Sequence, residues 1–176
     1  MQPTIDLDAF DRDILALLQE DASLSAAEIG ARVGLSQSPC WRRINRLEEA
    51  GVITRRVAHL DRHALGLDVL VFALVKLNAH GRRSLPEFAE AIQRYPEVQE
   101  CFTLMGDMDF LLRIVTRDIQ SYERFFFDTV SQLPGVQEVH SNIAMSEMKS
   151  TTALPLEEAF SSPRREAERR SRPGAG

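Results

Sequence analysis

Polar side chains between residues 37 and 50 have the types and spacing needed to contact DNA. At about 100° per residue of helix, several of them fall between roughly 140° and 240° from Cys40 and share one face. They are Ser38, Arg42, Asn45 and Arg46. Arginine can donate two hydrogen bonds to guanine, and asparagine can pair with adenine in the same way. This face predicts binding to phosphates and base edges, although its charge alone also fits a solvated helix surface.

The other side of this expected helix is apolar. Cys40, Ile44 and Leu47 fall within roughly 60° of one another and predict a narrow buried stripe. Trp41 and Arg43 lie on the shoulders between the two faces, where Trp41 is expected to pack or to contact the DNA backbone rather than to read a base. The helix is therefore expected to be held by one face while it presents the other.

The residues before this helix predict a helix-turn-helix. Apolar side chains recur at three- and four-residue steps over residues 7–21, which is typical of an amphipathic helix. Ser25 and Glu28 have the spacing of a capping box that begins a second helix. Gly34 can end that helix in the left-handed conformation, and a serine two or four residues later can cap the next one. Two helices joined by so tight a turn indicate this motif.

Positive charge is concentrated in and after the third helix. Residues 1–35 hold seven acidic side chains against two arginines, whereas residues 36–60 hold five arginines against two glutamates. Residues 52–57 are rich in β-branched side chains and are expected to form a short strand. Arg55 and Arg56 in this strand are candidates for phosphate contacts. Such a local basic surface is enough for a nucleic-acid binder, even in a chain with a net charge of -5.

The second half of the chain predicts a four-stranded sheet with two helices. The expected strands, the first of them buried on both faces, are residues 69–77, 98–105, 110–116 and 136–145. Ser84 and Glu87 have capping-box spacing ahead of one helix, and Asp118 is placed to cap the other. The order βαββαβ defines a ferredoxin-like fold. Two helices leave one sheet face uncovered, and the sheet of another subunit is expected to cover it.

Taken in order, these patterns resemble the Lrp/AsnC family of transcription regulators over about residues 5–155. The resemblance rests on residues 7–8, Asp11 and residues 14–15, 33–36, 38–44, 47–48 and 51–53. It implies an α+β chain with an N-terminal winged helix-turn-helix and then a ferredoxin-like βαββαβ domain for effector binding and dimerisation. The implied boundaries are 5–60 for the DNA-binding domain, 61–68 for a linker and 69–156 for the second domain.

The resemblance also implies which residues meet DNA and which meet an effector. The expected DNA-contacting set is Ser36, Gln37, Ser38, Trp41, Arg42, Arg43, Asn45, Arg46, Arg55 and Arg56. In the family's glycine and aspartate hairpin, Asp109 would hold the loop or receive an ammonium group, unless these residues merely make a turn. The expected effector set is Thr103, Gly106, Asp107, Met108, Asp109, Ile119, Asn142, Ile143 and Ala144.

The implied partners are double-stranded DNA, an amino acid or related metabolite as effector, and further copies of the chain. A homodimer that assembles into a tetramer or octamer is expected, with no cofactor, metal or catalytic residue. No run approaches the roughly 18 apolar residues of a membrane span, and the N-terminus lacks an export signal, so we expect a cytoplasmic protein.

Two further features follow from composition. Residues 157–176 are dominated by serine, proline, arginine, glutamate and glycine, and we expect a disordered tail there. Cys40 and Cys101 lie far apart in the sequence and belong to no metal-binding pattern, so both are expected to be buried thiols.

Other functions fit parts of the sequence. Decarboxylases of haem biosynthesis have a related architecture, and His140 and Arg113 would be the candidate proton donors. An enzyme has no reason to keep the polar helix face, however, so no enzymatic activity is expected. The second half could also be a sensor module that regulates another protein. His59 and His63 have a metal-compatible spacing only if their segment is helical.

Overall fold

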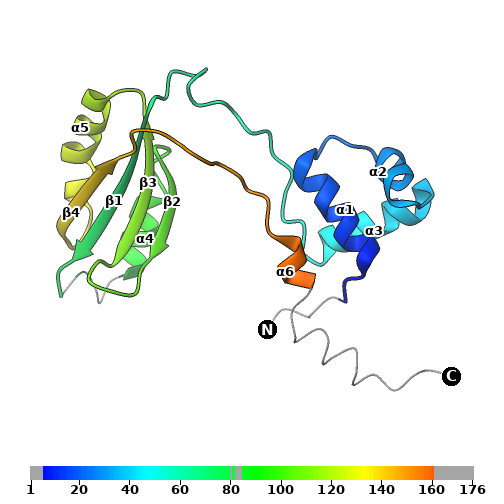
Figure 1. The fold of residues 1–176 in the computed structure, drawn as a ribbon. Coiled ribbons are helices and arrows are strands. Elements are labelled where there is room, and N and C mark those ends of the chain that lie inside the picture. Colours follow the sequence, from blue (N-terminus) through cyan, green and yellow to red (C-terminus); the bar gives the residue numbers. More distant parts are fainter. Residues whose placement is uncertain (1–5, 80, 82–84, 161–176) are drawn as a thin grey trace. The chain divides into compact units, whose positions relative to one another are not determined.

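The computed structural model describes residues 6–79, 81 and 85–160, which form two compact units (Figure 1). The first unit contains the described residues up to His59 together with those from Ser150 onward, and the second is Leu60–Lys149. Each unit has its own hydrophobic core. In the described part of the chain, no helix combines the length and the apolar character needed to cross a membrane.

The body of the first unit consists of α1 (Ala9–Glu20), α2 (Ala26–Val33) and α3 (Gln37–Glu49). Their inward faces meet in a core whose buried members are Ile14, Leu15, Ile29, Cys40, Ile44 and Leu47. The predicted apolar stripe on α3 is confirmed, because its members are the last three of these residues. Close packing of this stripe determines which side of α3 faces solvent.

The ends of these helices follow local hydrogen-bonding rules. Ser25 and Glu28 form the predicted capping box at the start of α2. Gly34 ends α2 with a φ of 76°, as expected for a left-handed cap. Ser36 occupies the N-cap position of α3, although its side chain makes no capping hydrogen bond. The helix-turn-helix is thus formed as predicted, with Gly34 in its tight turn.

The segment after α3 differs from the prediction. Residues 52–57 contain a bend and irregular backbone rather than a strand. The N–H groups of Val52 and Ile53 donate to the carbonyl of Leu47 at 2.9 and 3.1 Å, so they close the end of α3 instead of entering a sheet. The predicted strand is wrong because the described part of the first unit offers no second strand to pair with it.

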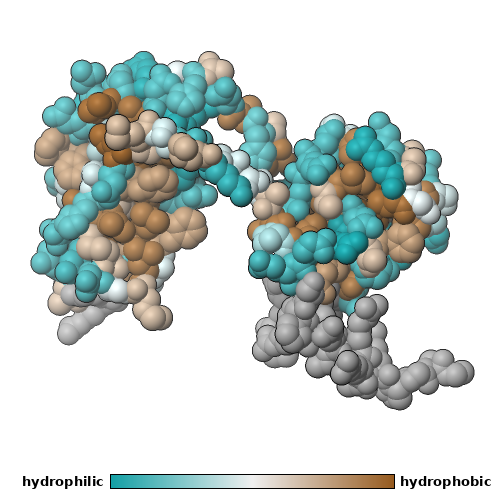
Figure 2. Space-filling model, viewed as in Figure 1, coloured by the Kyte–Doolittle hydropathy of each residue, from teal (hydrophilic) through white to brown (hydrophobic). Residues whose placement is uncertain are grey.

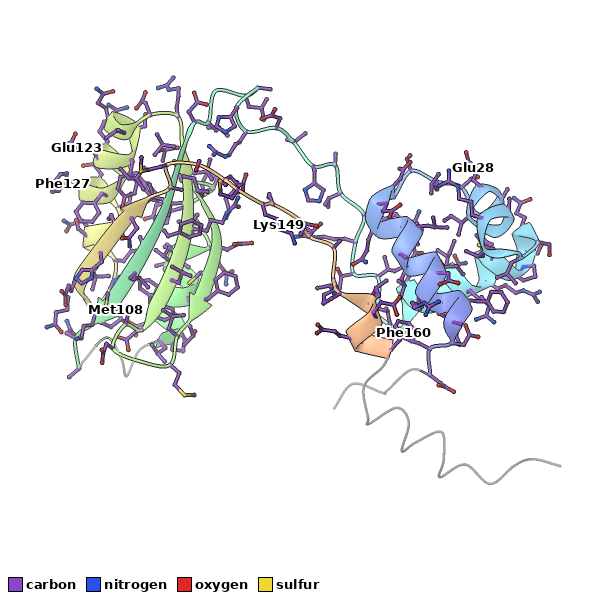
Figure 3. The ribbon with its side chains drawn as sticks, viewed as in Figure 1. Glu28, Met108, Glu123, Phe127, Lys149 and Phe160 are labelled. Atoms are coloured by element: carbon purple, nitrogen blue, oxygen red, sulfur yellow. The ribbon has the colours of Figure 1, made fainter. Side chains whose placement is uncertain are left out.

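A short C-terminal helix, α6 (Leu156–Phe160), also belongs to the first unit. Leu156 and Phe160 pack against the core of the three helices, and Figure 3 labels Phe160 in this position. The side chain of Gln19 accepts the N–H of Leu154 at 2.7 Å and donates to its carbonyl at 3.3 Å. Residues 157–160 therefore differ from the predicted disordered tail, because apolar side chains in this segment reach a core. Residues 161–176 lie outside the described residues.

The second unit is a four-stranded sheet with two helices on one face. Its strands are β1 (Val69–Leu77), β2 (Val98–Thr103), β3 (Phe110–Thr116) and β4 (Val136–Ile143). Its helices are α4 (Leu85–Ile92) and α5 (Ile119–Asp128), and the short 3-10 helix η2 (Val130–Gln132) follows α5. The strands lie in the order β2-β3-β1-β4 and all neighbours are antiparallel, which confirms the ferredoxin-like fold.

Caps were predicted for both helices, and the structure tests one of them. Asp118 caps α5 as expected, since its carboxylate accepts the N–H of Ser121 at 2.6 Å. Ser84, the expected cap of α4, lies outside the described residues. The predicted burial of both cysteines is half right, because Cys40 is buried whereas Cys101 is exposed on the edge strand β2.

Within the described part of one chain, helices cover only one face of the sheet. Val71, Ala73 and Val75 of β1 are fully buried in a core shared with residues of α4 and α5. Phe72 lies between them on the other face and is 37% exposed. The prediction that β1 is buried on both faces is therefore wrong for the single chain, because alternate side chains of a strand point to opposite faces.

The open face of the sheet carries adjacent apolar side chains. Phe102 of β2 pairs with Leu111 of β3, which pairs with Leu74 of β1. Phe72 lies two residues along β1 on the same face. Figure 2 shows hydrophobic residues gathered over the middle of this unit. Phe72, Leu74, Phe102 and Leu111 are termed the open-face patch below.

Replacing Leu156 by aspartate is expected to destabilise the first unit by about 1–3 kcal/mol, because a packed apolar side chain is lost and a charge takes its place. Hydrogen exchange of the α1 amides should become faster to the same extent. Leu154→Asp is the matched control, since that side chain is 70% exposed and the chain is held there through its backbone. Equal exchange rates in all three proteins would show that α6 does not stabilise this unit.

Candidate DNA-binding and effector sites

The start of α3 presents most of the predicted reading face to solvent. Ser36, Gln37, Ser38, Trp41 and Arg42 are exposed, and Asn45 is half-buried one turn further on. Arg42 makes no hydrogen bond or ion pair with the described residues. Its guanidinium group is therefore available to a guanine edge or a phosphate, while the buried stripe on the opposite side holds the helix.

Arg43 and Arg46 behave differently, because acidic side chains at the start of α1 hold them. Nη1 of Arg43 lies 2.9 Å from a carboxylate oxygen of Asp8 and 2.9 Å from one of Asp11. Nη2 of Arg46 lies 2.5 Å from the other oxygen of Asp11. Arg43 also lies over the ring of Phe10, 5.3 Å from its centroid. Asp8, Asp11, Arg43 and Arg46 are termed the ionic cluster.

The ionic cluster shifts the pKa of two of its members. Burial acts to raise the pKa of Asp8, but the N–H of Asp11 and the guanidinium of Arg43 together hold it below its ordinary value. Burial acts to lower the pKa of Arg43, but hydrogen bonds to Asp11 and Asp8 hold it above its ordinary value. Asp8 and Arg43 therefore both remain charged at neutral pH, which keeps the ion pair between them intact.

The two arginines that follow α3 also differ from each other. Arg56 donates to Glu48 at 2.9 Å and to the carbonyl of Ala22 at 3.4 Å, so it ties this segment to the helices. Arg55 is exposed and has no partner among the described residues. The predicted DNA-contacting set is thus divided into side chains that are free to meet DNA and three arginines already engaged within the unit. The engaged ones are Arg43, Arg46 and Arg56.

The turn between β2 and β3 contains the first part of the predicted effector set, namely Gly106, Asp107, Met108 and Asp109. Figure 3 labels Met108 at this end of the sheet. Asp109 ties the turn to β1, because its carboxylate accepts the N–H of Leu77 at 2.7 Å and its own N–H donates to Val75 at 2.9 Å. Gly106 has a φ of 153° and open space where a side chain would lie, so the backbone conformation rather than crowding favours glycine.

The remaining members of the predicted effector set are split between the two ends of the sheet. Thr103 ends β2 beside the turn. Asn142, Ile143 and Ala144 lie beside the start of β1, and Ile119 begins α5 after the same end of β3. At about 3.3 Å per strand residue, the two groups are separated by roughly 15 Å along β1. A single chain therefore does not bring the predicted effector residues into one site.

The residues considered for other chemistry are the candidate proton donors His140 and Arg113 and the possible metal pair His59 and His63. His140 and Arg113 lie on the open face, and each is hydrogen-bonded to a neighbouring side chain. Residues 54–61 form no helix, so the helical spacing that a metal pair of His59 and His63 would require is not met.

Sequence reasoning missed the partners of Arg43 and Arg46 on α3. Asp8 and Asp11 were counted among the acidic side chains of residues 1–35 and used in the family resemblance, but no partner was predicted for either. Part of the signal was present. Arg43 and Arg46 are spaced by three residues and so share one face of α3, and Asp8 and Asp11 have the same spacing at the start of α1. Nothing in the sequence, however, shows that these two faces meet.

The fold and the exposed face of α3 define a DNA-binding regulator with a separate ligand-binding domain, and comparison with known proteins agrees. Residues 7–54 match the family described as winged helix-turn-helix DNA-binding, and residues 70–154 match the Lrp/AsnC ligand binding domain. The transcriptional regulator AzlB of Bacillus subtilis is 40% identical over 86% of this chain and 97% of its own length. The DNA-binding transcriptional activator DecR of Escherichia coli is 37% identical over 86% of this chain and 99% of its own. The chain belongs to the Lrp/AsnC family of transcription regulators.

Solved structures extend this similarity to three dimensions. An AsnC family transcriptional regulator from Agrobacterium tumefaciens is 42% identical, with a TM-score of 0.81 over 86% of this chain and 98% of that one. A transcriptional regulator from Neisseria meningitidis, solved as a complex with L-Met, is 36% identical, with a TM-score of 0.84 over 88% and 99% of the two chains. These matches cover nearly the full length of both solved chains, so both units of this chain have counterparts in them.

Replacing Arg42 by alanine is expected to lower the ratio of specific to nonspecific DNA affinity about 5- to 150-fold, because a bidentate base contact is worth about 1–3 kcal/mol. Arg55→Ala should instead weaken binding to all DNA and reduce the salt slope by about one, since it removes one phosphate contact. Fluorescence anisotropy titrations at several salt concentrations measure both quantities. Equal changes of the ratio in the two variants would contradict this division of roles.

Proposed function

We propose that this chain works in the cytoplasm as a homodimeric regulator that reads an operator through α3 and responds to an amino acid or related metabolite. The observation that carries the proposal is the free polar face of α3. Ser38, Arg42 and Asn45 lie on the face of α3 opposite its buried apolar stripe, so a rigid helix positions them. Their polar groups remain available to bind DNA. The proposed contacts to DNA come from this face, from Ser36, Gln37 and Trp41, and from Arg55.

The homodimer is proposed from the open-face patch. Phe72 and Phe102 are 37% and 51% exposed and lie beside Leu74 and Leu111 on the same face. A small domain that leaves such a surface in water is expected to cover it, and an identical sheet provides a surface of the same shape and polarity. A two-fold axis between the sheets repeats the DNA-binding unit as well. Further association into a tetramer or octamer is proposed to bring two such dimers together.

The effector site is proposed to lie at a boundary between subunits. One chain places the β2–β3 turn and the group from Ile119 and Asn142 to Ala144 at opposite ends of its sheet. A neighbouring copy can bring its own turn to the second group. The L-Met complex of the Neisseria meningitidis regulator supports an amino acid as the ligand. A site built from two chains would let the ligand favour one assembly over another.

No enzymatic activity is proposed. The candidate proton donors His140 and Arg113 lie on the open face, which the proposed partner sheet would cover. A sensor module for another protein is the remaining alternative, and it differs in predicting ligand binding without specific DNA binding.

Replacing Phe72 by glutamate is expected to raise the dissociation constant of the dimer about 100-fold or more. Two symmetry-related phenyl groups are lost from the interface, each worth about 1.5–3 kcal/mol, and two buried charges appear. Light scattering over a concentration series measures this constant. Phe127→Glu is the control, because Phe127 is 60% exposed on α5 and lies outside the open-face patch (Figure 3). A Phe72→Glu protein that stayed dimeric at low micromolar concentration would rule out this interface.

Replacing Asp109 by asparagine is expected to abolish the response of DNA affinity to the effector. The amide oxygen can still accept the N–H of Leu77, so the turn is kept while the charge that would bind an ammonium group is lost. Calorimetry with each of the twenty amino acids identifies the ligand, and titration of DNA from upstream of the chain's own coding sequence, against shuffled DNA, measures the response. Asp128→Asn, an exposed change in the same unit, is the control.

The outcomes separate the competing functions. Specific DNA binding that an amino acid changes in the wild type, but not in Asp109→Asn, supports the proposal. Binding of an amino acid with no preference for the upstream DNA would favour the sensor module. An undiminished response in Asp109→Asn would remove this carboxylate from the mechanism.

A further inference from the structure

Asp11 is the only charged side chain that is buried among the described residues, and its exposure is 0%. It lies in the first turn of α1, where it forms a capping box with Asp8 that fixes its position. Burial of a carboxylate away from water is unfavourable unless hydrogen-bond donors and charged partners compensate for the lost water. The structure supplies these donors from α3, the helix that carries the proposed reading face.

Both oxygens of Asp11 are used. Oδ1 accepts a hydrogen bond from Nη1 of Arg43 at 2.9 Å. Oδ2 accepts one hydrogen bond from Nη2 of Arg46 at 2.5 Å and another from the backbone N–H of Asp8 at 3.0 Å. Arg43 is held further by Asp8 and by the ring of Phe10. The ionic cluster therefore joins the first turn of α1 to one flank of α3.

Movement of these arginines to DNA would break ion pairs with a buried carboxylate, although the arginine side chains themselves are 27% and 45% exposed. If Arg46 turned to a phosphate, Asp11 would lose a charged partner in a place that water does not reach, which is unfavourable. Arg42 lies on the same helix but has no such partner. The difference between Arg42 and Arg46 is thus set by α1, and not by their own chemistry.

We propose that Asp11 is a positioning residue that determines DNA specificity by occupying Arg43 and Arg46 and so removing them from phosphate contacts. This inference rests on the proposed DNA-binding function. Phosphate contacts strengthen binding to every sequence alike, whereas base contacts distinguish sequences. An acidic residue that withholds two arginines from phosphates lowers nonspecific binding and leaves the free residues Arg42 and Asn45 to determine the choice of site.

The first test replaces each arginine by glutamine and measures affinity for upstream and shuffled DNA at several salt concentrations. Arg46→Gln should leave both affinities within about twofold of the wild type and the salt slope unchanged, because Arg46 does not touch phosphate. Arg42→Gln, the matched change at an exposed position of the same helix, should lower affinity for the upstream DNA about tenfold. A tenfold loss or a reduced salt slope in Arg46→Gln would overturn the proposal. Arg43 still holds Asp11 in this variant, so the unit is expected to fold.

The second test replaces Asp11 by asparagine, which keeps the shape of the side chain and frees at least one arginine. Binding to shuffled DNA should strengthen severalfold, with a salt slope steeper by about 0.9 for each new phosphate contact, and the ratio of specific to nonspecific affinity should fall. A role in folding alone would weaken binding to both DNAs instead. Asp13→Asn removes the same charge from α1 at a position whose one partner among the described residues is the half-buried Arg12, so it controls for net charge.

A folded Asp11→Asn protein with an unchanged salt slope would overturn the proposal. If circular dichroism shows that this variant is unfolded, the Arg46→Gln titration decides the question. A wild type that binds upstream and shuffled DNA equally well would refute the proposed function itself. A wild type that is specific, with Arg46→Gln as damaging as Arg42→Gln, would refute only the role of Asp11.

Discussion

The rotation of α3 about its own axis decides which of its side chains face solvent, and so which can meet DNA in the proposed complex. Two interactions of different kinds fix that rotation. The stripe of Cys40, Ile44 and Leu47 is buried in the core of the first unit, and the ionic cluster ties one flank of the helix to α1. Apolar packing is tolerant of small rotations, whereas two guanidinium groups on one buried carboxylate demand a particular geometry. Specific recognition needs such rigidity, because a base contact is lost with a small displacement.

Much of this arrangement follows from local sequence rules. The capping box of Ser25 and Glu28, the left-handed Gly34 and the apolar stripe on α3 depend on neighbours within a few residues, and all were predictable. The same holds for the strand and helix order of the second unit, because period-two and helical patterns are strong there. Asp118 could be identified as a cap for the same reason.

Features that depend on contacts distant in the sequence were not predictable. The β-branched side chains of residues 52–57 predicted a strand, but a strand forms only where a partner exists. Here the backbone closes the end of α3 instead. The hydrogen bonds of Asp11 with Arg43 and Arg46 connect residues that are more than thirty positions apart in the sequence. The packing of Leu156 and Phe160 on the first unit likewise depends on a return of the chain that no local pattern reveals.

The chain passes between its two units twice, once after His59 and again after Lys149. Both ends of the second unit, Leu60–Lys149, are therefore joined to the first unit. In the proposed oligomer, a change in how the second units assemble would therefore alter the spacing of the α3 helices that are proposed to meet DNA. Hydroxyl-radical footprinting of the wild type on its upstream DNA tests this account most directly. The account predicts protected segments on one face of the duplex, repeated about every 10 base pairs, as expected for paired recognition helices one helical turn apart. Uniform protection without such a repeat, or none at all at concentrations that saturate binding, would contradict it.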